Sequence, residues 1–482
     1  MLKPFYITTT LPYVNADPHI GFAMEIIRAD TIARVKKLAG HEVFFNTGTD
    51  EHGLKVYRKA KEQNIDTQTY VDGLSKKYKE LLPQLGILPE IAFIRTTDPR
   101  HKRAATEFWN RVNANGFIYK KAYSIKYCVG CELEKTESEL HEGRCPLHPA
   151  QDLETIEEEN HFFKWSQFQE KLLTFYEANP TFVIPDFRFN EIKAFVARGL
   201  EDFSISRLAS KMPWGVPVPG DATQVMYVWF DALVDYISTL GWPDDDASFT
   251  KWWIETGGAV QYCGKDNLRQ QAAMWQAMLM AADLPPSKTI VINGFITGDG
   301  GLKMSKSLGN TVDPLDIVRD YGTDALRYYV LRELTAFEDS PFTSEKFKDA
   351  YNAHLANGIG NLTSRILKMV TTYGITLSEA EKKMRYYTEE IADQFTHSFD
   401  LSKKTGEVWQ KIAMLDEHIQ RTEPFKKIKT EPEDAKKDVH EILVHLYEIA
   451  LMLEPFLPET AVTIQTLIKE NKMPEQPLFM RK

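Results

Sequence analysis

The chain has 482 residues and a formal net charge of −10, and hydrophobic and charged residues make up 43% and 26% of it. This length predicts two to four domains, and the acidic balance argues against a general nucleic-acid coat while it leaves room for a local basic face. No apolar run reaches the roughly 20 residues that span a bilayer, and the N-terminus has neither a signal nor a transit peptide pattern, so we expect a cytoplasmic protein.

The first 115 residues alternate predicted strands with predicted helices, which favours a parallel sheet covered by helices. Strands are predicted at 3–9 and 41–49, and helices at 21–40, 53–64, 67–85 and 98–115. The sequence PHIG at 18–21 follows the first strand and opens the first helix. A helix N-terminus offers free N–H groups to a phosphate, His19 can donate a hydrogen bond to it, and Gly21 lets a flat base approach the backbone.

Residues 116–215 break this alternation and are interpreted as an insertion. They contain Cys128-x₂-Cys131 and Cys145-x₂-His148, two ligand pairs separated by 13 residues. This paired spacing predicts one tetrahedral zinc, which would be structural because protein fills all four positions. The alternative is three buried cysteines beside an unrelated histidine. The fourth cysteine, at 263, is expected in a core.

The α/β pattern resumes over 216–295. Its predicted elements are a strand and helix at 225–238, a strand, turn and helix at 259–282, and an apolar strand at 289–296. A glycine-rich turn, GDGG at 298–301, precedes the sequence KMSKS at 303–307. Lys303 and Lys306 on a mobile loop can follow the charge that develops on a departing pyrophosphate. Alone, the same five residues are also compatible with a solvated basic loop.

Strand signals vanish over 346–482, where three long segments have helical periodicity and prolines separate them. This pattern predicts a C-terminal helix bundle. The chain is therefore expected to combine a split α/β unit with an all-α region.

The two phosphate-directed sequences together resemble the HIGH and KMSKS signatures of the class I aminoacyl-tRNA synthetases. Further segments, in this order, resemble the methionyl-tRNA synthetase family: TLPYVNADPHIG, NTGTDEHG, YCVGCE, CPLH, DFSISR, VWFDA, GKDN and NGFITGDGGLKMSKSLGN. The similarity covers nearly the whole chain, although the helical region carries fewer landmarks.

This resemblance implies a Rossmann-like catalytic domain split by a zinc-binding insertion and followed by an all-α anticodon-binding bundle. The implied parts are the two catalytic halves at 1–115 and 216–295, a connective insertion with a zinc knuckle at 116–215, a KMSKS and stem-contact region at 296–345, and the anticodon-binding domain at 346–482. The implied activity is ATP-dependent attachment of methionine to initiator and elongator tRNA(Met) through methionyl-adenylate. One structural zinc and magnesium with ATP are implied, and a monomer is expected.

The resemblance also implies roles for individual residues. The groups expected to bind ATP are His19, Gly21, Gly264, Asp266, Phe295, Ile296, Lys303 and Lys306, with His19 and the two lysines as the catalytic groups. The groups expected to bind methionine are Leu11, Tyr13, Asp50, Trp229, Tyr236, Gln271 and Trp275. The groups expected to contact the anticodon are Arg365, Phe425 and His354.

A plainer structural role is an alternative for several of these residues. The three aromatic residues Trp229, Tyr236 and Trp275 can be core packing, and Asp50 can be a loop cap. In the helical region, Arg365 can form a surface salt bridge, and Phe425 can pack against the bundle.

The chain departs from the family pattern at four positions near the expected active site. Phe22 replaces the last histidine of HIGH, and a phenyl ring cannot donate to a phosphate. Gln271 stands where the family has a pocket histidine, and Asn267 and Gln270 replace apolar or aromatic neighbours. We still expect an active enzyme, because the other signature groups are present.

Three rival interpretations remain at this stage. The isoleucine, valine and leucine synthetases carry a much longer editing insertion, and the cysteine enzymes use scattered zinc ligands. A tRNA-binding protein without activity is supported only by Phe22 and Gln271. A smaller-molecule adenylate-forming ligase has no use for a long helical domain.

Overall fold

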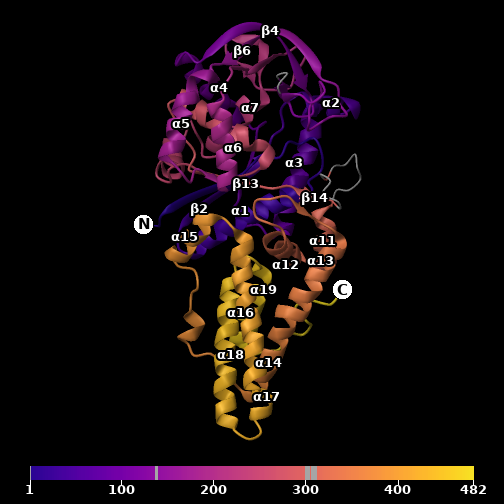
Figure 1. Ribbon diagram of the computed structural model, residues 1–482, viewed down its shortest axis with the longest axis vertical. Helices are drawn as coiled ribbons and strands as arrows, with labels where there is room; N and C mark the ends of the chain where they lie inside the picture. The colour runs from indigo at the N-terminus through magenta and orange to yellow at the C-terminus, as the bar shows by residue number, and fades with distance from the viewer. Residues whose placement is uncertain (1, 136–138, 299–303, 305–311) are drawn as a thin grey trace.

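The computed structural model describes residues 2–135, 139–298, 304 and 312–482. The α/β part and the helical part lie at opposite ends of an elongated molecule (Figure 1). Across the described ranges, no helix combines the length and apolar character needed to cross a membrane.

A six-stranded parallel sheet forms the centre of the α/β part and confirms the expected fold class. Its strands, in spatial order, are β3 (Ala92–Arg95), β2 (Glu42–Thr49), β1 (Pro4–Thr9), β12 (Val260–Gly264), β13 (Thr289–Asn293) and β7 (Val183–Ile184). The central strand β1 is rich in β-branched and aromatic residues, and five of its six residues are buried. Its Ile7 pairs with Phe45 of β2 on one side and with Val260 of β12 on the other.

The strand order changes direction between β1 and β12, because later strands are added on opposite sides of β1. Open α/β sheets bind ligands outside the carboxyl ends of their strands at such a switch point. The sheet topology therefore indicates where to look for a ligand site.

The four helices predicted in the first part are confirmed as α1 (Ile20–Leu38), α2 (Leu54–Glu62), α3 (Thr67–Gln84) and α4 (Pro99–Ala114). Helix α1 begins with His19 as its N-cap, and the chain leaves it through Gly40 at φ +91°. The short strand β3 was not predicted from the sequence. It pairs with β2 over only four residues, which is too short for a clear periodic signal.

The insertion forms an antiparallel sheet of β5 (Leu133–Lys135), β4 (Ile118–Cys128), β6 (Glu154–Phe163) and β8 (Phe203–Ser204). The acidic sequence at 152–160 showed no clear alternation, yet most of it belongs to β6, because β4 supplies a long antiparallel partner. Helices α5 (Gln169–Ala178) and α6 (Asp186–Ala197) follow. Strand β7 also lies within 116–215, but it pairs with β13 and extends the parallel sheet.

The strand predicted at the start of 225–238 has a different partner from the one expected. It is β11 (Asp221–Met226), which pairs antiparallel with β9 (Ser206–Leu208) and β10 (Pro217–Val218). The α/β alternation therefore resumes in the sheet only at β12. Three short helices, α7 (Val228–Ala232), α8 (Asp235–Ser238) and α9 (Asp246–Phe249), lie between β11 and β12 in the chain. A fourth, α10 (Trp275–Ala281), lies between β12 and β13.

The C-terminal region is helical, as predicted, and its longest helices run along the long axis in Figure 1. Two short strands, β14 (Ile296–Thr297) and β15 (Ser340–Pro341), pair in parallel; β14 precedes the helices of this region, and β15 lies between the second and the third of them. The helices are α11 (Pro314–Tyr321), α12 (Thr323–Tyr328), α13 (Ser344–Ala350), α14 (Asn361–Tyr373), α15 (Glu389–Ser398), α16 (Leu401–Thr422), α17 (Pro424–Lys427), α18 (Pro432–Leu453) and α19 (Pro458–Glu470). The π-helical segment η9 (Tyr351–Gly360) joins α13 to α14.

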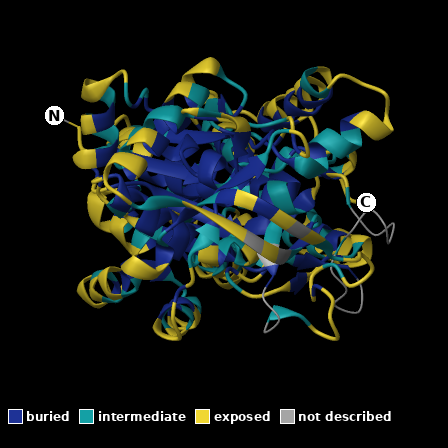
Figure 2. Cartoon of the chain, turned by 90° about the horizontal axis from the view of Figure 1, so that it is seen from above, coloured by how far each residue is buried: buried dark blue, intermediate teal, exposed yellow. Residues whose placement is uncertain are grey.

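Two buried hydrophobic clusters flank the parallel sheet. One combines α1 with the helical region, and the other combines α4 and α10 with the insertion. Figure 2 shows the buried residues at the centre and the exposed ones at the rim. The fully buried Arg327 joins the two parts, because it pairs with Asp30 of α1 at 2.8 Å and donates to the Phe456 carbonyl at 2.9 Å.

Candidate functional site

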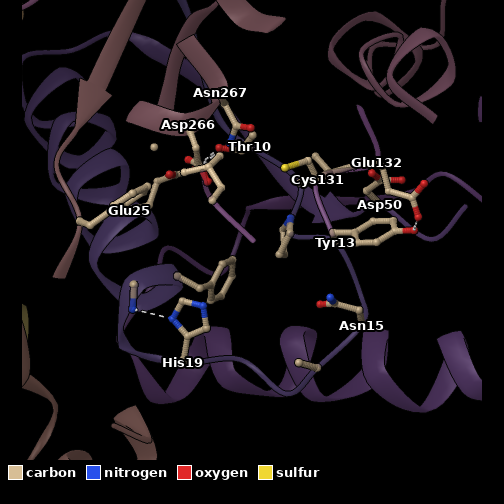
Figure 3. Close-up of a pocket in the computed structure, with 18 of the residues that line it drawn as sticks. Thr10, Tyr13, Asn15, His19, Glu25, Asp50, Cys131, Glu132, Asp266 and Asn267 are labelled. Carbon is tan, nitrogen blue, oxygen red and sulfur yellow. Dashed lines mark hydrogen bonds between the residues drawn. The ribbon is translucent and has the colours of Figure 1, made fainter. Parts of the chain in front are cut away.

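A cavity of about 470 Å³ opens at the switch point of the parallel sheet, where the ends of β1, β12 and β13 meet the start of α1. Figure 3 shows His19 on one side of it, Thr10, Glu25 and Asp266 on another, and a group formed by Tyr13, Asp50, Cys131 and Glu132. The sheet thus brings together residues that are more than 200 positions apart in the chain.

His19 lies at the N-terminus of α1, as the PHIG sequence predicts. Its Nδ1 accepts a hydrogen bond from the Gly21 backbone N–H at 3.0 Å. A neutral imidazole with an acceptor at Nδ1 carries its proton on Nε2, which is the arrangement needed to donate to a phosphate. A Cβ on residue 21 would lie 2.7 Å from His19 Cε1, so the glycine is required for this close cap.

Phe22 lines the same cavity, and its ring meets the Tyr78 ring edge-on with centroids 5.1 Å apart. Tyr78 belongs to α3, and it also lines the cavity. The residue that replaces the signature histidine is therefore part of a packed aromatic wall.

Glu25 is a cavity residue that the sequence analysis missed. Its Oε1 accepts hydrogen bonds from the Thr10 backbone N–H at 2.9 Å and the Thr10 hydroxyl at 2.6 Å. Burial, assisted by the nearby Asp266 carboxylate, raises the pKa of Glu25 to about 8. No local pattern indicated it, because Glu25 lies six residues after His19, which is not one of the i+3 or i+4 spacings that place two side chains on one helix face.

The predicted methionine residues divide into two groups. Leu11, Tyr13, Asp50 and Trp229 line the cavity. Tyr236, Gln271 and Trp275 do not line it and are fully buried. They form one cluster, because Gln271 Nε2 donates to Tyr236 Oη at 2.7 Å and the Tyr236 and Trp275 ring centroids are 6.0 Å apart.

Asp50 is the strongest candidate for binding a cation in the cavity. Its Oδ1 is buried and has no hydrogen-bond partner among the described residues. Burial and the nearby Asp231 carboxylate raise the pKa of Asp50 well above its ordinary value. An ammonium group placed here would satisfy the orphaned oxygen and favour the charged carboxylate.

Asp231 lies behind this wall in a buried network that the sequence analysis did not detect. The His52 Nδ1 and His101 Nε2 atoms lie 2.5 and 2.8 Å from its two oxygens. Burial alone would raise the pKa of Asp231, but His52 and His101 outweigh that effect and lower it. The result is a fixed negative charge next to Asp50.

The residues expected to bind ribose and adenine also meet at the cavity, which Gly264, Asp266, Phe295 and Ile296 line. A Cβ on Gly264 would lie 2.7 Å from Asp266 Oδ1, so the glycine leaves room for that carboxylate. The backbone N–H of Phe295 donates to Asp339 at 2.9 Å. Asn267 and Gln270, two of the departures from the family pattern, line the cavity as well.

The predicted lysines, Lys303 and Lys306, and most of the GDGG turn lie outside the described residues. The described residue between the lysines, Met304, lines the cavity.

The four predicted metal ligands come together, with all ligand atoms within 4.8 Å of one another. Cys131 Sγ lies 3.4 Å from Cys145 Sγ and 3.2 Å from His148 Nδ1. A tetrahedral zinc with bonds of about 2.0–2.3 Å requires ligand atoms at such separations, and the donor set is typical of structural zinc. A Cβ on Gly130 would lie 2.6 Å from the His148 ring, so this glycine makes room for the ligand. By contrast, Cys263 is buried in a hydrophobic cluster, as expected.

A second cavity, of about 530 Å³, lies in the helical region and is lined by Arg365 and His354. Arg365 Nη1 pairs with Asp416 at 2.6 Å, so the salt-bridge alternative is present in the structure. Phe425 does not line this cavity, but its side chain is 43% exposed at the start of α17. The ring is therefore accessible, and its contact with an anticodon base stays a prediction.

Comparisons with known proteins agree with this geometry. The family described as "tRNA synthetases class I (M)" matches residues 5–154 and 134–367. The methionine–tRNA ligase of Synechocystis is 39% identical over 480 residues, which cover 95% of this chain and 88% of the relative. That of Rickettsia bellii is 38% identical over 96% of this chain and 92% of the relative.

Solved structures of methionyl-tRNA synthetases are also similar to this chain. The Mycobacterium tuberculosis methionyl-tRNA synthetase in complex with methionyl-adenylate has a TM-score of 0.88 and 33% identity, over 100% of this chain and 98% of that one. The free form of the same enzyme has a TM-score of 0.83 and 30% identity. The chain belongs to the class I tRNA synthetases and, within them, to the methionyl-tRNA synthetase family.

Proposed function

We propose that this chain is a methionine–tRNA ligase that joins methionine to its tRNA through methionyl-adenylate. The observation that supports this function most directly is the orphaned Asp50 carboxylate in the same cavity as the His19 helix cap. One group suits an α-ammonium, and the other suits a phosphate.

In the first step, a carboxylate oxygen of methionine attacks the α-phosphorus of ATP, and pyrophosphate leaves. We assign Asp50 to the ammonium, and Leu11, Tyr13 and Trp229 to the side chain, since a thioether favours aromatic neighbours. No side-chain nucleophile is needed, so positioning and charge stabilisation supply the catalysis.

The nucleotide is assigned to the other side of the cavity. His19 and the first N–H groups of α1 are proposed to hold phosphate oxygens, Asp266 the ribose and Ile296 the adenine. Lys303 and Lys306 are proposed to stabilise the departing pyrophosphate, and magnesium is proposed to accompany ATP and neutralise part of its charge.

In the second step, the terminal ribose hydroxyl of the tRNA attacks the adenylate carbonyl, and AMP leaves. We propose that 346–482 recognises the anticodon of initiator and elongator tRNA(Met), with Arg365, Phe425 and His354 as contacts. A guanidinium can both donate to a base and stack on it, and an exposed phenyl ring can stack.

The proposed domain division keeps the catalytic halves at 1–115 and 216–295, the zinc-bearing insertion at 116–215 and the stem-contact region at 296–345. The four-ligand cluster supports a structural zinc in the insertion.

ATP–pyrophosphate exchange tests the first step. We expect exchange with methionine above that with leucine, isoleucine, valine or cysteine, and strong loss in Asp50→Asn, which keeps the shape but not the charge. Charging of tRNA(Met) then tests the second step. Absence of methionine-dependent exchange would refute the proposal. Faster exchange with one of the other four amino acids would assign that amino acid as the substrate instead.

A further inference from the structure

Glu132 joins the zinc knuckle to the main cavity. It directly follows the predicted ligand Cys131, yet its side chain lines the cavity and is not one of the four clustered ligands. Its backbone has φ +52°, a left-handed conformation that is uncommon outside glycine, and the residue is only 5% exposed. This turn directs a buried carboxylate away from the metal ligands.

Three hydrogen bonds hold that carboxylate. Its Oε1 accepts from the Tyr13 hydroxyl at 3.0 Å and from the Lys55 backbone N–H at 2.7 Å. Its Oε2 accepts from the Tyr127 hydroxyl. Figure 3 shows the Tyr13 hydroxyl pointing at Glu132, with Cys131 and Asp50 close by.

The bond to Lys55 also completes the start of α2. Gly53, the N-cap of this helix, supplies no side-chain hydrogen bond. Glu132, which lies far from α2 in the sequence, accepts from the Lys55 N–H in its place. A negative charge is favourable at this end of a helix.

Tyr13 is held from two sides by these contacts. A Cβ on Gly53 would lie 2.5 Å from the Tyr13 hydroxyl, so the start of α2 closes one side, and Glu132 closes another. The Tyr13 backbone forms a parallel bridge with Asp50, and the neighbouring Val14 N–H donates to the Asp50 carbonyl at 3.0 Å. A displacement of Tyr13 would therefore also displace the backbone of Asp50.

We propose that Glu132 is a positioning residue for the methionine side of the cavity, and that it acts by holding Tyr13 and the start of α2. This inference rests on the proposed function. Among the described residues, the hydrogen bonds of Glu132 go to Tyr13, Lys55, Tyr127 and Tyr227 and to none of the groups assigned to ATP, so its effect is expected on methionine binding alone.

Substitutions at residue 132 test the role. In Glu132→Ala we expect the methionine KM in exchange to rise about tenfold or more, since a buried hydrogen bond to a charged group is lost, while the ATP KM stays within about threefold. Glu132→Gln should restore a methionine KM near that of the wild type. Its amide oxygen can still accept from Tyr13 and Lys55, and its amide nitrogen can donate to Tyr127.

Tyr127→Phe is the matched control, because it removes a partner of Glu132 without touching Tyr13. It should lower the thermal midpoint but leave the methionine KM within about threefold of the wild type. In a Tyr13→Phe background, adding Glu132→Ala should raise the methionine KM much less than it does in the wild type, since the two residues act through one bond.

Zinc content, measured for every variant, separates this role from damage to the knuckle. We expect the metal content of the wild type in all of them. The proposal would be overturned if Glu132→Ala left the methionine KM unchanged or raised the methionine and ATP KM values equally. It would also be overturned if the effects of Glu132→Ala and Tyr13→Phe were fully additive, or if the rise in methionine KM accompanied a loss of zinc. If Glu132→Ala does not fold, the methionine KM of Glu132→Gln decides. A methionine KM near that of the wild type supports the proposal, and one raised as far as in Tyr13→Phe overturns it. Wild-type protein without methionine-dependent exchange would instead refute the proposed function.

Discussion

At the residue scale, two of the four departures from the family pattern, Phe22 and Gln271, have a structural explanation. Phe22 gives up a donor but contributes a ring to the wall it shares with Tyr78. Gln271 keeps a polar role, since it accepts from Gln261 at 3.0 Å and donates to Tyr236. The remaining phosphate-directed group on α1, His19, is already oriented by its own cap.

Restoring the signature histidine should therefore have a modest effect. We expect Phe22→His to change the rate of methionine activation by less than about 100-fold, because one hydrogen bond to a charged group contributes about 1.5–3 kcal/mol. Pyrophosphate-exchange kinetics measure this change. Phe22→Leu is the control, since it removes the ring without adding a donor. A larger gain would mean that the natural residue limits catalysis.

Glu25 makes a prediction about pH. Burial raises its pKa from 4.5 to about 8, so in this window the folded protein holds a proton that the unfolded chain releases. The contribution of this group is therefore a loss of stability as pH rises from about 5 to about 8. Glu25→Gln should reduce the fall in thermal midpoint between these two pH values. The exposed Glu80→Gln is the control, and an unchanged slope in Glu25→Gln would contradict the assignment.

Most of the described residues that the family resemblance assigned to ATP and methionine line the cavity, but the sequence did not predict which of them lie behind its wall. Leu11, Tyr13 and Asp50 line it, and the buried cluster around Tyr236 does not. Distance from a cavity depends on packing between α8, α10 and the sheet, which no local sequence motif encodes. Glu25 and Glu132 were missed for a similar reason, because their partners are distant in sequence.

At the element scale, the zinc knuckle is a local feature. All four ligands lie within 21 residues, so their spacing alone predicts the cluster that the structure shows. The neighbouring Glu132 then ties this local unit to α2.

Removing one ligand should release the metal. We expect about one zinc per chain in the wild type and little in Cys145→Ser, with a lower thermal midpoint, because a structural site contributes folding free energy. Metal analysis of the purified protein provides the measurement. Cys263→Ser is the matched control, since Cys263 lies in a hydrophobic cluster away from the site and should leave the zinc content unchanged. Retention of zinc in Cys145→Ser would contradict the assigned ligand set.

At the scale of the whole molecule, the two cavities lie in different parts of the chain, one at the parallel sheet and one in the helical region. The buried Arg327 and a shared hydrophobic cluster join these parts, so they form a continuous packed body. Because the two cavities share no lining residue in the described part of the chain, recognition of the anticodon and activation of methionine are expected to be separable by mutation.

Arg365→Ala tests this separation. We expect the KM for tRNA to rise roughly 5- to 150-fold, as the loss of one base contact predicts, while methionine-dependent exchange is unchanged. Charging and exchange assays on the same preparation measure both effects. Lys437→Ala, on the exposed face of α18, is the control. A loss of exchange in Arg365→Ala would show that the two sites are coupled.

The sequence by itself determined the first alternating strands and helices, the cluster of four predicted metal ligands, the helix start after PHIG and the family resemblance, because each depends on spacing over a few residues or on a short motif. The tertiary structure decided the partners of β7 and β11, the buried position of Tyr236, the raised pKa of Glu25 and the link made by Glu132. These features depend on contacts between segments far apart in the chain, where burial and neighbouring charges arise only once the sheet has formed.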